Sequence, residues 1–221
     1  EDLLLVKYDP NGDRQWTRQL GSSGDDVAFA SATDSSGNVY AAGYTEGGLD
    51  GNTHIGSFDL FLIKYDSKGG KLWSVQHGTS AKDVIFAVAT DTSGNVYISG
   101  YTAGNLDSNT SSGGDDLILI KYNSSGIRQW TKQYGSSGSD YARGVSLDSS
   151  GNIYVVGDTS GGLGSNSNSG SEDLFLIKYD SSGNLQWTKQ LGTFTNDVAF
   201  DVATDSSGNS YVTGYTGGSL D

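Results

Sequence analysis

The chain has 221 residues, enough for one sizeable domain, and its 11% of aromatic side chains argues against disorder. Asp and Glu outnumber Lys and Arg by 26 to 13, and the net charge of −13 excludes a nucleic-acid-binding surface, which needs the opposite sign. The absence of Cys excludes disulfides and thiol catalysis, and no apolar run approaches the roughly 20 residues that insertion into a membrane requires. Because Met is also absent, we expect a processed form or a segment of a longer protein.

A period of 57 residues runs through the whole chain without insertion or deletion. It is most visible in the tryptophans, which are Trp16, Trp73, Trp130 and Trp187. A fixed period in this range indicates a solenoid, a propeller or an array. We therefore predict a single domain over residues 1–221, with repeats that start at Asp2, Asp59, Asp116 and Asp173.

The elements begin with two predicted strands within residues 2–20, and the fourth repeat shows one full period. Its predicted strands are residues 173–179, 185–191, 198–204 and 210–216. The first of these is apolar on both faces except for one Lys, as in a strand covered on both sides. Helical periodicity is absent and Ser/Gly-rich stretches separate the strands, so the sequence predicts an all-β fold.

The turns between the predicted strands repeat one chemistry. In the run Asp9-Pro10-Asn11-Gly12, Pro suits the second position of a type I turn and Gly suits the left-handed position of a bulged hairpin. A second set of corners opens with Asp34, Asp91, Asp148 and Asp205. Asp at the start of such a turn accepts hydrogen bonds from nearby backbone N–H groups, so we expect these corners to be structural.

The runs DLFLIKYDSSGNLQWTKQLG and NDVAFDVATDSSGNSYVTGYT resemble the bacterial β-propeller repeat family known as SBBP repeats. The resemblance covers all four copies and nearly the whole chain. It implies a propeller of four-stranded blades, of a kind typical of secreted or surface-associated bacterial proteins. It implies neither an enzyme activity nor a single ligand.

The resemblance also implies an order of strands in each blade. The segment carrying VATD would be innermost, followed outward by VYxxGYT, DLFLIKY and LQWTKQL, and the small residues Ala28, Ala30 and Ala32 suit a crowded axis. With this phase the chain starts and ends with half a blade. We predict a closed four-bladed β-propeller in which residues 2–20 pair with residues 198–216, which would remove exposed sheet edges. The alternatives are a head-to-tail polymer and a segment of a protein with more copies.

The sequence contains few candidates for catalysis. His54 and His77 are the only histidines and neither recurs in the other copies. No serine lies in a G-x-S-x-G motif, and neither a phosphate-binding loop nor a zinc spacing is present. Carboxylates recur with the repeat, as a scaffold produces, so we expect no enzyme activity.

Calcium is the strongest chemical hypothesis from the residues. Oxygen-bearing side chains recur at Asp50, Asn52 and Asp59, and again at Asp107, Asn109 and Asp116, in a spacing that resembles the first half of an acidic calcium loop. The third copy has Gly164 in the leading position, and the fourth would have to combine Asp221 with Asp2. The alternative is a polar loop with Asx turns.

The recurring tyrosines and the terminal half-blades suggest two kinds of partner. Tyr44, Tyr101 and Tyr215 recur near Gly and Asp and suggest glycan binding, although Asp158 replaces the Tyr in copy three and packing between blades is the alternative. The half-blades at both ends and the long Ser/Gly/Asn loops favour self-association as a homo-oligomer or filament. We expect a secreted or cell-surface module that interacts with itself or with other surface proteins, with a glycan-binding lectin as the alternative.

Overall fold

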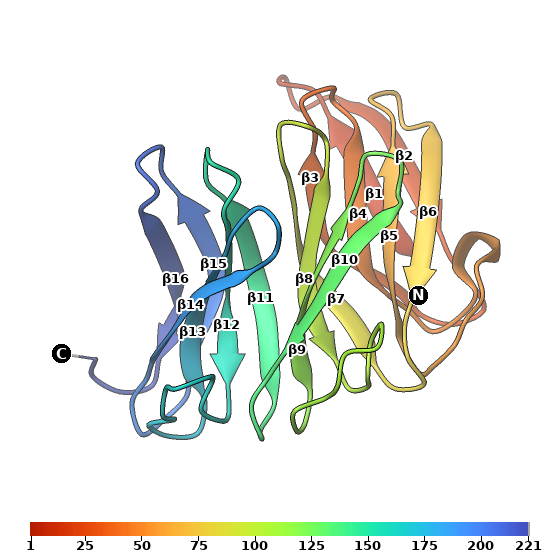
Figure 1. The fold of residues 1–221 in the computed structure, drawn as a ribbon. Helices are drawn as coiled ribbons and strands as arrows, with labels where there is room; N and C mark the ends of the chain where they lie inside the picture. Colours follow the sequence, from red (N-terminus) through yellow and green to blue (C-terminus); the bar gives the residue numbers. More distant parts are fainter. Residues whose placement is uncertain (221) are drawn as a thin grey trace.

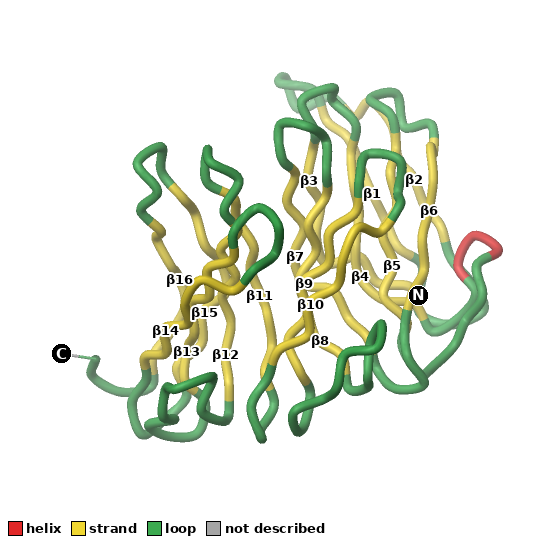
Figure 2. Tube along the Cα trace, in the orientation of Figure 1, coloured by secondary structure: helices red, strands yellow, loops and turns green. Residues whose placement is uncertain are grey.

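The computed structural model describes residues 1–220, and in that range the chain forms sixteen β-strands and one short 3₁₀ turn, η1 (Leu49–Gly51). The strands run up and down between loops at the two ends of the molecule (Figures 1 and 2). This confirms the all-β prediction. Each strand coincides closely with a segment that the 57-residue period marks.

The strands form three complete four-stranded sheets, or blades, with a two-stranded half-blade at each end. The N-terminal half-blade is β1 (Leu3–Tyr8) and β2 (Arg14–Leu20), and the C-terminal one is β15 (Asp197–Thr204) and β16 (Ser210–Thr216). The first blade is β3 (Asp26–Thr33), β4 (Val39–Thr45), β5 (Asp59–Tyr65) and β6 (Lys71–His77). The second is β7 (Asp83–Thr90), β8 (Val96–Thr102), β9 (Asp116–Tyr122) and β10 (Arg128–Tyr134). The third is β11 (Asp140–Leu147), β12 (Ile153–Thr159), β13 (Asp173–Tyr179) and β14 (Leu185–Leu191).

The order of strands within a blade follows the prediction. The sheets run β3-β4-β5-β6, β7-β8-β9-β10 and β11-β12-β13-β14, so each blade joins the second half of one repeat to the first half of the next. The strands β3, β7, β11 and β15 lie against one another across the blades, which makes them the inner strands of an arc.

The two half-blades do not pair with each other in this structure. β1-β2 and β15-β16 are separate two-stranded sheets at opposite ends of the arc (Figure 1). The predicted closed ring of four blades is therefore not formed here. The three complete blades lie between the two half-blades, so the free edges of β1 and β16 stay apart.

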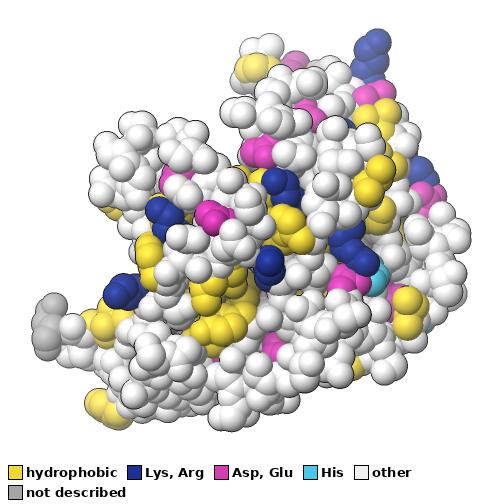
Figure 3. Space-filling model, viewed as in Figure 1, with side chains coloured by type: hydrophobic (Ala, Val, Ile, Leu, Met, Phe, Trp, Pro, Cys, Tyr) yellow, Lys and Arg dark blue, Asp and Glu magenta, His cyan; other side chains and the backbone are white. Residues whose placement is uncertain are grey.

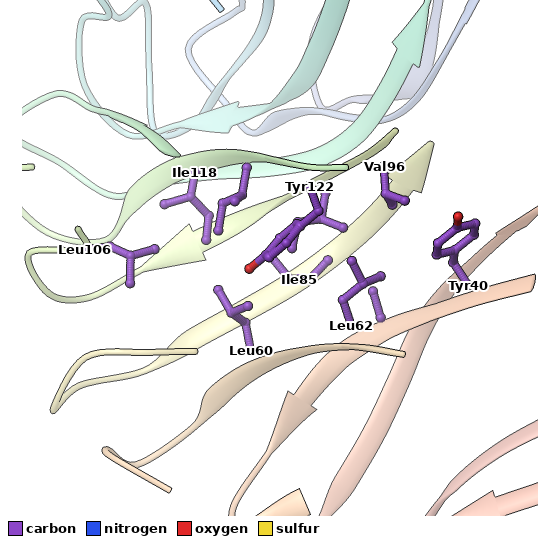
Figure 4. Close-up of a cluster of buried hydrophobic side chains, with 11 residues drawn as sticks. Tyr40, Leu60, Leu62, Ile85, Val96, Leu106, Ile118 and Tyr122 are labelled. Carbon is purple, nitrogen blue, oxygen red and sulfur yellow. The ribbon is translucent and has the colours of Figure 1, made fainter. Parts of the chain in front are cut away.

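The hydrophobic core lies between neighbouring blades. One cluster joins Leu60 and Leu62 on β5 to Ile118 and Ile120 on β9, with Tyr40 of β4 beside them (Figure 4). All seven residues of β5 are buried, as expected of a strand covered on both faces. On the molecular surface, hydrophobic side chains also gather in the hollow at the middle of the face shown in Figure 3.

The Asp corners are structural, as predicted. Asp91 accepts hydrogen bonds from the backbone N–H of Ser93 and of Asn95, both at 2.9 Å, and from the side chains of Asn95 and Tyr97 at 2.7 and 3.2 Å. Burial alone would raise the pKa of Asp91, but these hydrogen bonds hold it below its usual value. The same contacts form at Asp34, Asp148 and Asp205.

Each inner strand contains a β-bulge that the sequence reading did not predict. The pairing register shifts between Ala28 and Ala30 in β3, and the same shift occurs in β7, β11 and β15. The bulged residues are Phe29, Phe86, Arg143 and Phe200. A bulge changes the direction of the side chain it carries. Large side chains, and not only the small ones predicted for the axis, therefore project from the inner strands.

Candidate functional site

The four bulged side chains form a continuous line across the inner strands, which we call the axial row: Phe29, Phe86, Arg143 and Phe200. The ring centroids of Phe29 and Phe86 are 5.5 Å apart. The Arg143 guanidinium lies 5.7 Å from the Phe86 ring and 5.8 Å from the Phe200 ring. Phe29 and Phe200 are 51% and 52% exposed, so the row presents aromatic faces to solvent.

The tyrosines predicted as ligand-binding residues lie directly behind the axial row. Tyr44 is 5.9 Å from Phe29, Tyr101 is 5.7 Å from Phe86 and Tyr215 is 5.8 Å from Phe200, all between ring centroids. Tyr44 also stacks on Phe58 at 4.5 Å. The structure thus brings these tyrosines into an aromatic layer that packs within and between blades. This packing accounts for the tyrosines without a ligand. Glycan binding stays a prediction.

Copy three replaces this aromatic pair with an ion pair. Arg143 takes the place of the Phe and Asp158 the place of the Tyr, and the Arg143 guanidinium binds both carboxylate oxygens of Asp158, with Nη2 3.3 Å from Oδ2. Asp158 is 1% exposed. Burial raises the pKa of Asp158, while Arg143 acts to lower it. The departure of copy three from the Tyr pattern is therefore one coupled exchange of two neighbouring residues.

Carboxylates lie beside two tyrosines of this region, Tyr141 and Tyr44. The Tyr141 hydroxyl donates a hydrogen bond of 2.7 Å to Asp115, and burial together with this bond raises the pKa of Tyr141 to about 12. Burial raises the pKa of Tyr44 as well, and the charge of Glu46 adds to it. Asp115 and Glu46 thus add negative charge at the rim of the aromatic layer.

In the first predicted calcium loop, the three residues have partners within the chain. Asp50 forms an ion pair with Lys71 and accepts a hydrogen bond from Ser74. Asn52 donates to the carbonyl of Leu49 at 2.8 Å. Asp59 is fully buried at the start of β5, where it accepts hydrogen bonds from the loop backbone, including 2.8 Å from the N–H of Ile55.

The second predicted loop repeats this arrangement. Asp107 pairs with Arg128 at 2.7 Å and with His77 at 2.9 Å. Asn109 donates to the carbonyl of Leu106 at 2.7 Å, and Asp116 accepts from the N–H of Ser112 at 2.9 Å. Asp50, Asp107 and Gly164 share a left-handed backbone, with φ of 56°, 53° and 63°. Glycine adopts this conformation most easily, so Gly164 in copy three suits the same turn that Asp50 and Asp107 form in the first two copies.

The side chains of both predicted calcium loops already have partners within the chain, and calcium binding stays a prediction. Among residues 1–220, no three His, Asp or Glu side chains lie close enough together to hold a metal ion. The leading carboxylates face the cations of Lys71 and Arg128, and the Asn amides cap turns. Of the predicted fourth pair, Asp221 lies outside the described residues and Asp2 accepts a hydrogen bond from Gln19 at 2.7 Å.

A recurring glutamine was missed by the sequence reading. Gln76 donates to Asp59 at 2.8 Å and to the carbonyl of Gly47 at 3.0 Å, while its oxygen accepts from the N–H of Leu49 at 2.9 Å. Gln133 and Gln190 make the same three contacts in their own repeats. The signal was present, because this Gln belongs to the repeated W-T-K-Q strand. Its role is to attach the long loop to the outer strand.

Pairs of buried carboxyl groups lie at the junctions between blades. Asp59 and Asp83 are fully buried, and a Cβ added to Gly78 would lie 2.6 Å from an oxygen of Asp59 and 3.0 Å from one of Asp83. Asp116 and Asp140 converge over Gly135 in the same way. One oxygen of Asp116, Oδ1, has no hydrogen-bond partner in the part of the chain that the structure describes.

The buried pairs predict a dependence of stability on pH. Burial raises the pKa of Asp140 above its reference value of 3.8, and the charge of Asp116 raises it further, although Thr159 and Ser136 donate hydrogen bonds to it. The folded state then binds the proton more tightly than the unfolded state does. This contribution to stability is fully present below about pH 3.8 and is lost as the pH rises through the folded pKa.

Asp140→Asn is the variant that tests this. The Asn oxygen keeps the bond from Ser136, and its amide donates to the Thr159 hydroxyl, which in turn donates to the carbonyl of Gly161 at 3.0 Å. We expect the stability of the variant, relative to the parent chain, to improve between pH 4 and pH 7 in urea unfolding. An equal difference at both pH values would contradict the raised pKa.

The fold and the axial row define a β-propeller repeat protein. The SBBP β-propeller repeat family matches residues 15–50, 72–107, 129–164 and 186–221, and the chain belongs to this family. The resemblance drawn from the sequence is thereby confirmed. Within residues 1–220, none of the helical segments has the length and apolar character needed to cross a membrane.

Three known proteins are similar to the chain. Regulatory protein FlaEY of Caulobacter vibrioides is 31% identical over 204 residues, covering 80% of this chain and 21% of that protein. The uncharacterized WD repeat-containing protein L264 of Acanthamoeba polyphaga mimivirus is 24% identical, covering 83% of this chain and 17% of its own length. The chain thus spans about a fifth of the length of these relatives. A protein of unknown function from Bacteroides caccae shares the fold, with a TM-score of 0.54 at 13% identity over 95% of this chain and 64% of its own.

Proposed function

We propose that the chain is a non-enzymatic structural and protein-interaction module that associates with a second copy of itself by completing blades. The observation that carries this proposal is the pair of free strand edges. In a complete blade, the second strand pairs with a third strand. β16 corresponds to a second strand without its third, and β1 corresponds to a third strand without its second. Unpaired strand edges are templates for the addition of another strand. The names of the two relatives, a regulatory protein and a WD repeat protein, are compatible with such a role.

The complete blades define the expected register. In all three, the second strand pairs with the third without a shift; for example, Ala42 lies opposite Leu62 and Tyr40 opposite Lys64. Because the repeats are in constant phase, the same register places Thr213 opposite Leu5 of the second copy. It also places Tyr211 opposite Lys7 of the second copy.

The side chains along the free edges are complementary. In each complete blade a Lys lies over a Tyr ring at 5.0 Å, as Lys64 does over Tyr40. Lys64 also pairs with Asp34 at 3.3 Å. The corresponding Tyr211 is 59% exposed whereas Tyr40 is fully buried. Lys7 of a second copy would supply the missing cation to Tyr211.

The apolar contacts between blades are left incomplete in the same way. Leu60 and Leu62 pack against Ile118 and Ile120 in one cluster, and Leu117 and Leu119 pack against Phe175 and Ile177 in the next. In the same repeat spacing, Leu174 and Leu176 would pack against Leu4 and Val6 of a second copy. Leu4 is 60% exposed, and Leu174 and Leu176 line an open groove of about 450 Å³.

A cysteine pair at the predicted contact tests the proposal, because the chain has no Cys of its own. With Leu5→Cys and Thr213→Cys in one chain, we expect a ladder of disulfide-linked multimers on a non-reducing gel. A monomer with an internal disulfide would instead support closure of a four-bladed ring and overturn pairing with a second copy. The absence of any disulfide would overturn both arrangements. The control carries cysteines at Ile127 and Leu185, which are exposed but lie on neither β1 nor β16.

Light scattering of the unmodified chain measures the same association. We expect the average mass to rise with concentration, and Leu4→Asp to abolish the rise. Leu72→Asp is the matched control, since Leu72 is similarly exposed on the outer strand β6. The proposal includes a secreted or cell-surface location, which the family resemblance supports and which fractionation of a producing cell would test.

A further inference from the structure

We propose that, in the single chain, the axial row is a binding site for arginine side chains of a partner protein; this goes beyond the blade completion described above, which would bring Phe200 of one copy beside Phe29 of another. The row consists of Phe29, Phe86, Arg143 and Phe200, and its rim carries carboxylates. Phe29 and Phe200 each expose about half of their surface, at 51% and 52%. The observations that define the ligand are the side chain already held in the row and the charge around it.

Arg143 shows what the row accepts. Its guanidinium lies within 5.8 Å of three aromatic rings, those of Phe86, Tyr141 and Phe200. A cation over an aromatic face is attracted by the negative charge of that face, and the planar guanidinium stacks better than an ammonium does. The chain thus already holds one guanidinium in the middle of the row by the contacts we propose for the partner.

The neighbouring Phe29 provides the same surface without a cation. It packs against Phe86 on one side and against Tyr44 on the other, and about half of its surface stays open to solvent. Tyr44 stacks on Phe58, whose ring already holds the Lys82 ammonium at 5.0 Å. Both cationic side chains found beside this aromatic layer therefore lie over ring faces.

The charge around the row complements a cation. Glu46 is exposed beside Tyr44, and Asp115 accepts the hydrogen bond from the Tyr141 hydroxyl. Asp201 follows Phe200 directly and is exposed, and its Cα lies 3.0 Å from a Cβ built on Gly144 of the adjacent inner strand. These carboxylates belong to a chain with a net charge of −13. An anionic or neutral apolar partner would gain nothing from this rim.

The proposal is tested with three labelled heptapeptides, GRGRGRG, GKGKGKG and GEGEGEG, titrated by fluorescence anisotropy. We expect the arginine peptide to bind more tightly than the lysine peptide, and the glutamate peptide not to bind. Phe29→Leu retains the apolar volume but removes the ring face, and we expect it to weaken the arginine peptide about two- to fivefold. Phe194→Leu is the matched control, because Phe194 is 81% exposed outside the row.

Equal binding of the arginine and lysine peptides, with no effect of Phe29→Leu, would reduce the interaction to net charge and overturn the proposal. Loss of binding in Phe194→Leu to the same extent would also overturn it. The experiment is separated from blade completion when it is repeated at a chain concentration at which light scattering shows only monomers. Arginine-peptide binding there, without self-association, separates the two proposals.

Discussion

Replacing Gly100 by Ala is expected to unfold the second blade. Gly100 on β8 faces the bulge of β7, where the register shifts between Ile85 and Ala87. A Cβ at Gly100 would lie 2.8 Å from the Cα of Ile85 and closer still to the carbonyl oxygen of Val84. Both are backbone atoms in a central blade, so no side-chain rotation relieves the clash.

The expected loss exceeds about 3 kcal/mol, the upper end of ordinary overpacking, because the bulge itself would have to move. Urea unfolding followed by Trp fluorescence measures it. Gly94→Ala is the matched control. Gly94 has φ of 76° in the corner of the same blade, and only Ser124 Cβ, at 3.5 Å, lies near the added methyl, so we expect about 1–2 kcal/mol. Losses of equal size in the two variants would contradict the role of the bulge.

The four copies of this glycine also show what the sequence could and could not predict. Gly43, Gly100, Gly157 and Gly214 recur at the repeat spacing, so their importance was visible. The reason for their importance was not visible, because it depends on a bulge in the partner strand. A segment such as DVAFASAT has the pattern of an ordinary strand, and its register shift appears only when the facing strand is in place. The axial row was missed for the same reason.

The blade order was predictable from the resemblance to the SBBP family, and the constant phase of the repeats applies that order to every blade. Ring closure was not, since pairing of β1 with β16 satisfies the same side chains within one molecule or between two. Calcium binding stays a prediction, because a turn with a left-handed Asp50 and an Asn52 cap has the same spacing as the first half of an ion-binding loop. The ion pair of Asp50 with Lys71 could not be predicted from that spacing.

Arg143→Phe is expected to destabilise the chain strongly, although Phe is the residue that the other three repeats have. The substitution leaves Asp158, which is 1% exposed, as an unpaired carboxylate among apolar neighbours. Removing one partner of a buried ion pair costs about 3–5 kcal/mol. Because the pKa of Asp158 would then rise further, we expect the loss to be smaller at pH 4 than at pH 7.

The double variant Arg143→Phe with Asp158→Tyr should recover most of this loss. It restores the Phe–Tyr pair whose rings lie 5.7–5.9 Å apart in the other repeats. Residues in contact are expected to couple, and replacing a buried ion pair by packed hydrophobic residues is often neutral or stabilising. Urea unfolding of both single variants and the double variant gives the coupling free energy. If the double variant lost the sum of the two single losses, Arg143 and Asp158 would be independent, and the departure of copy three from the Tyr pattern would not be a coupled exchange.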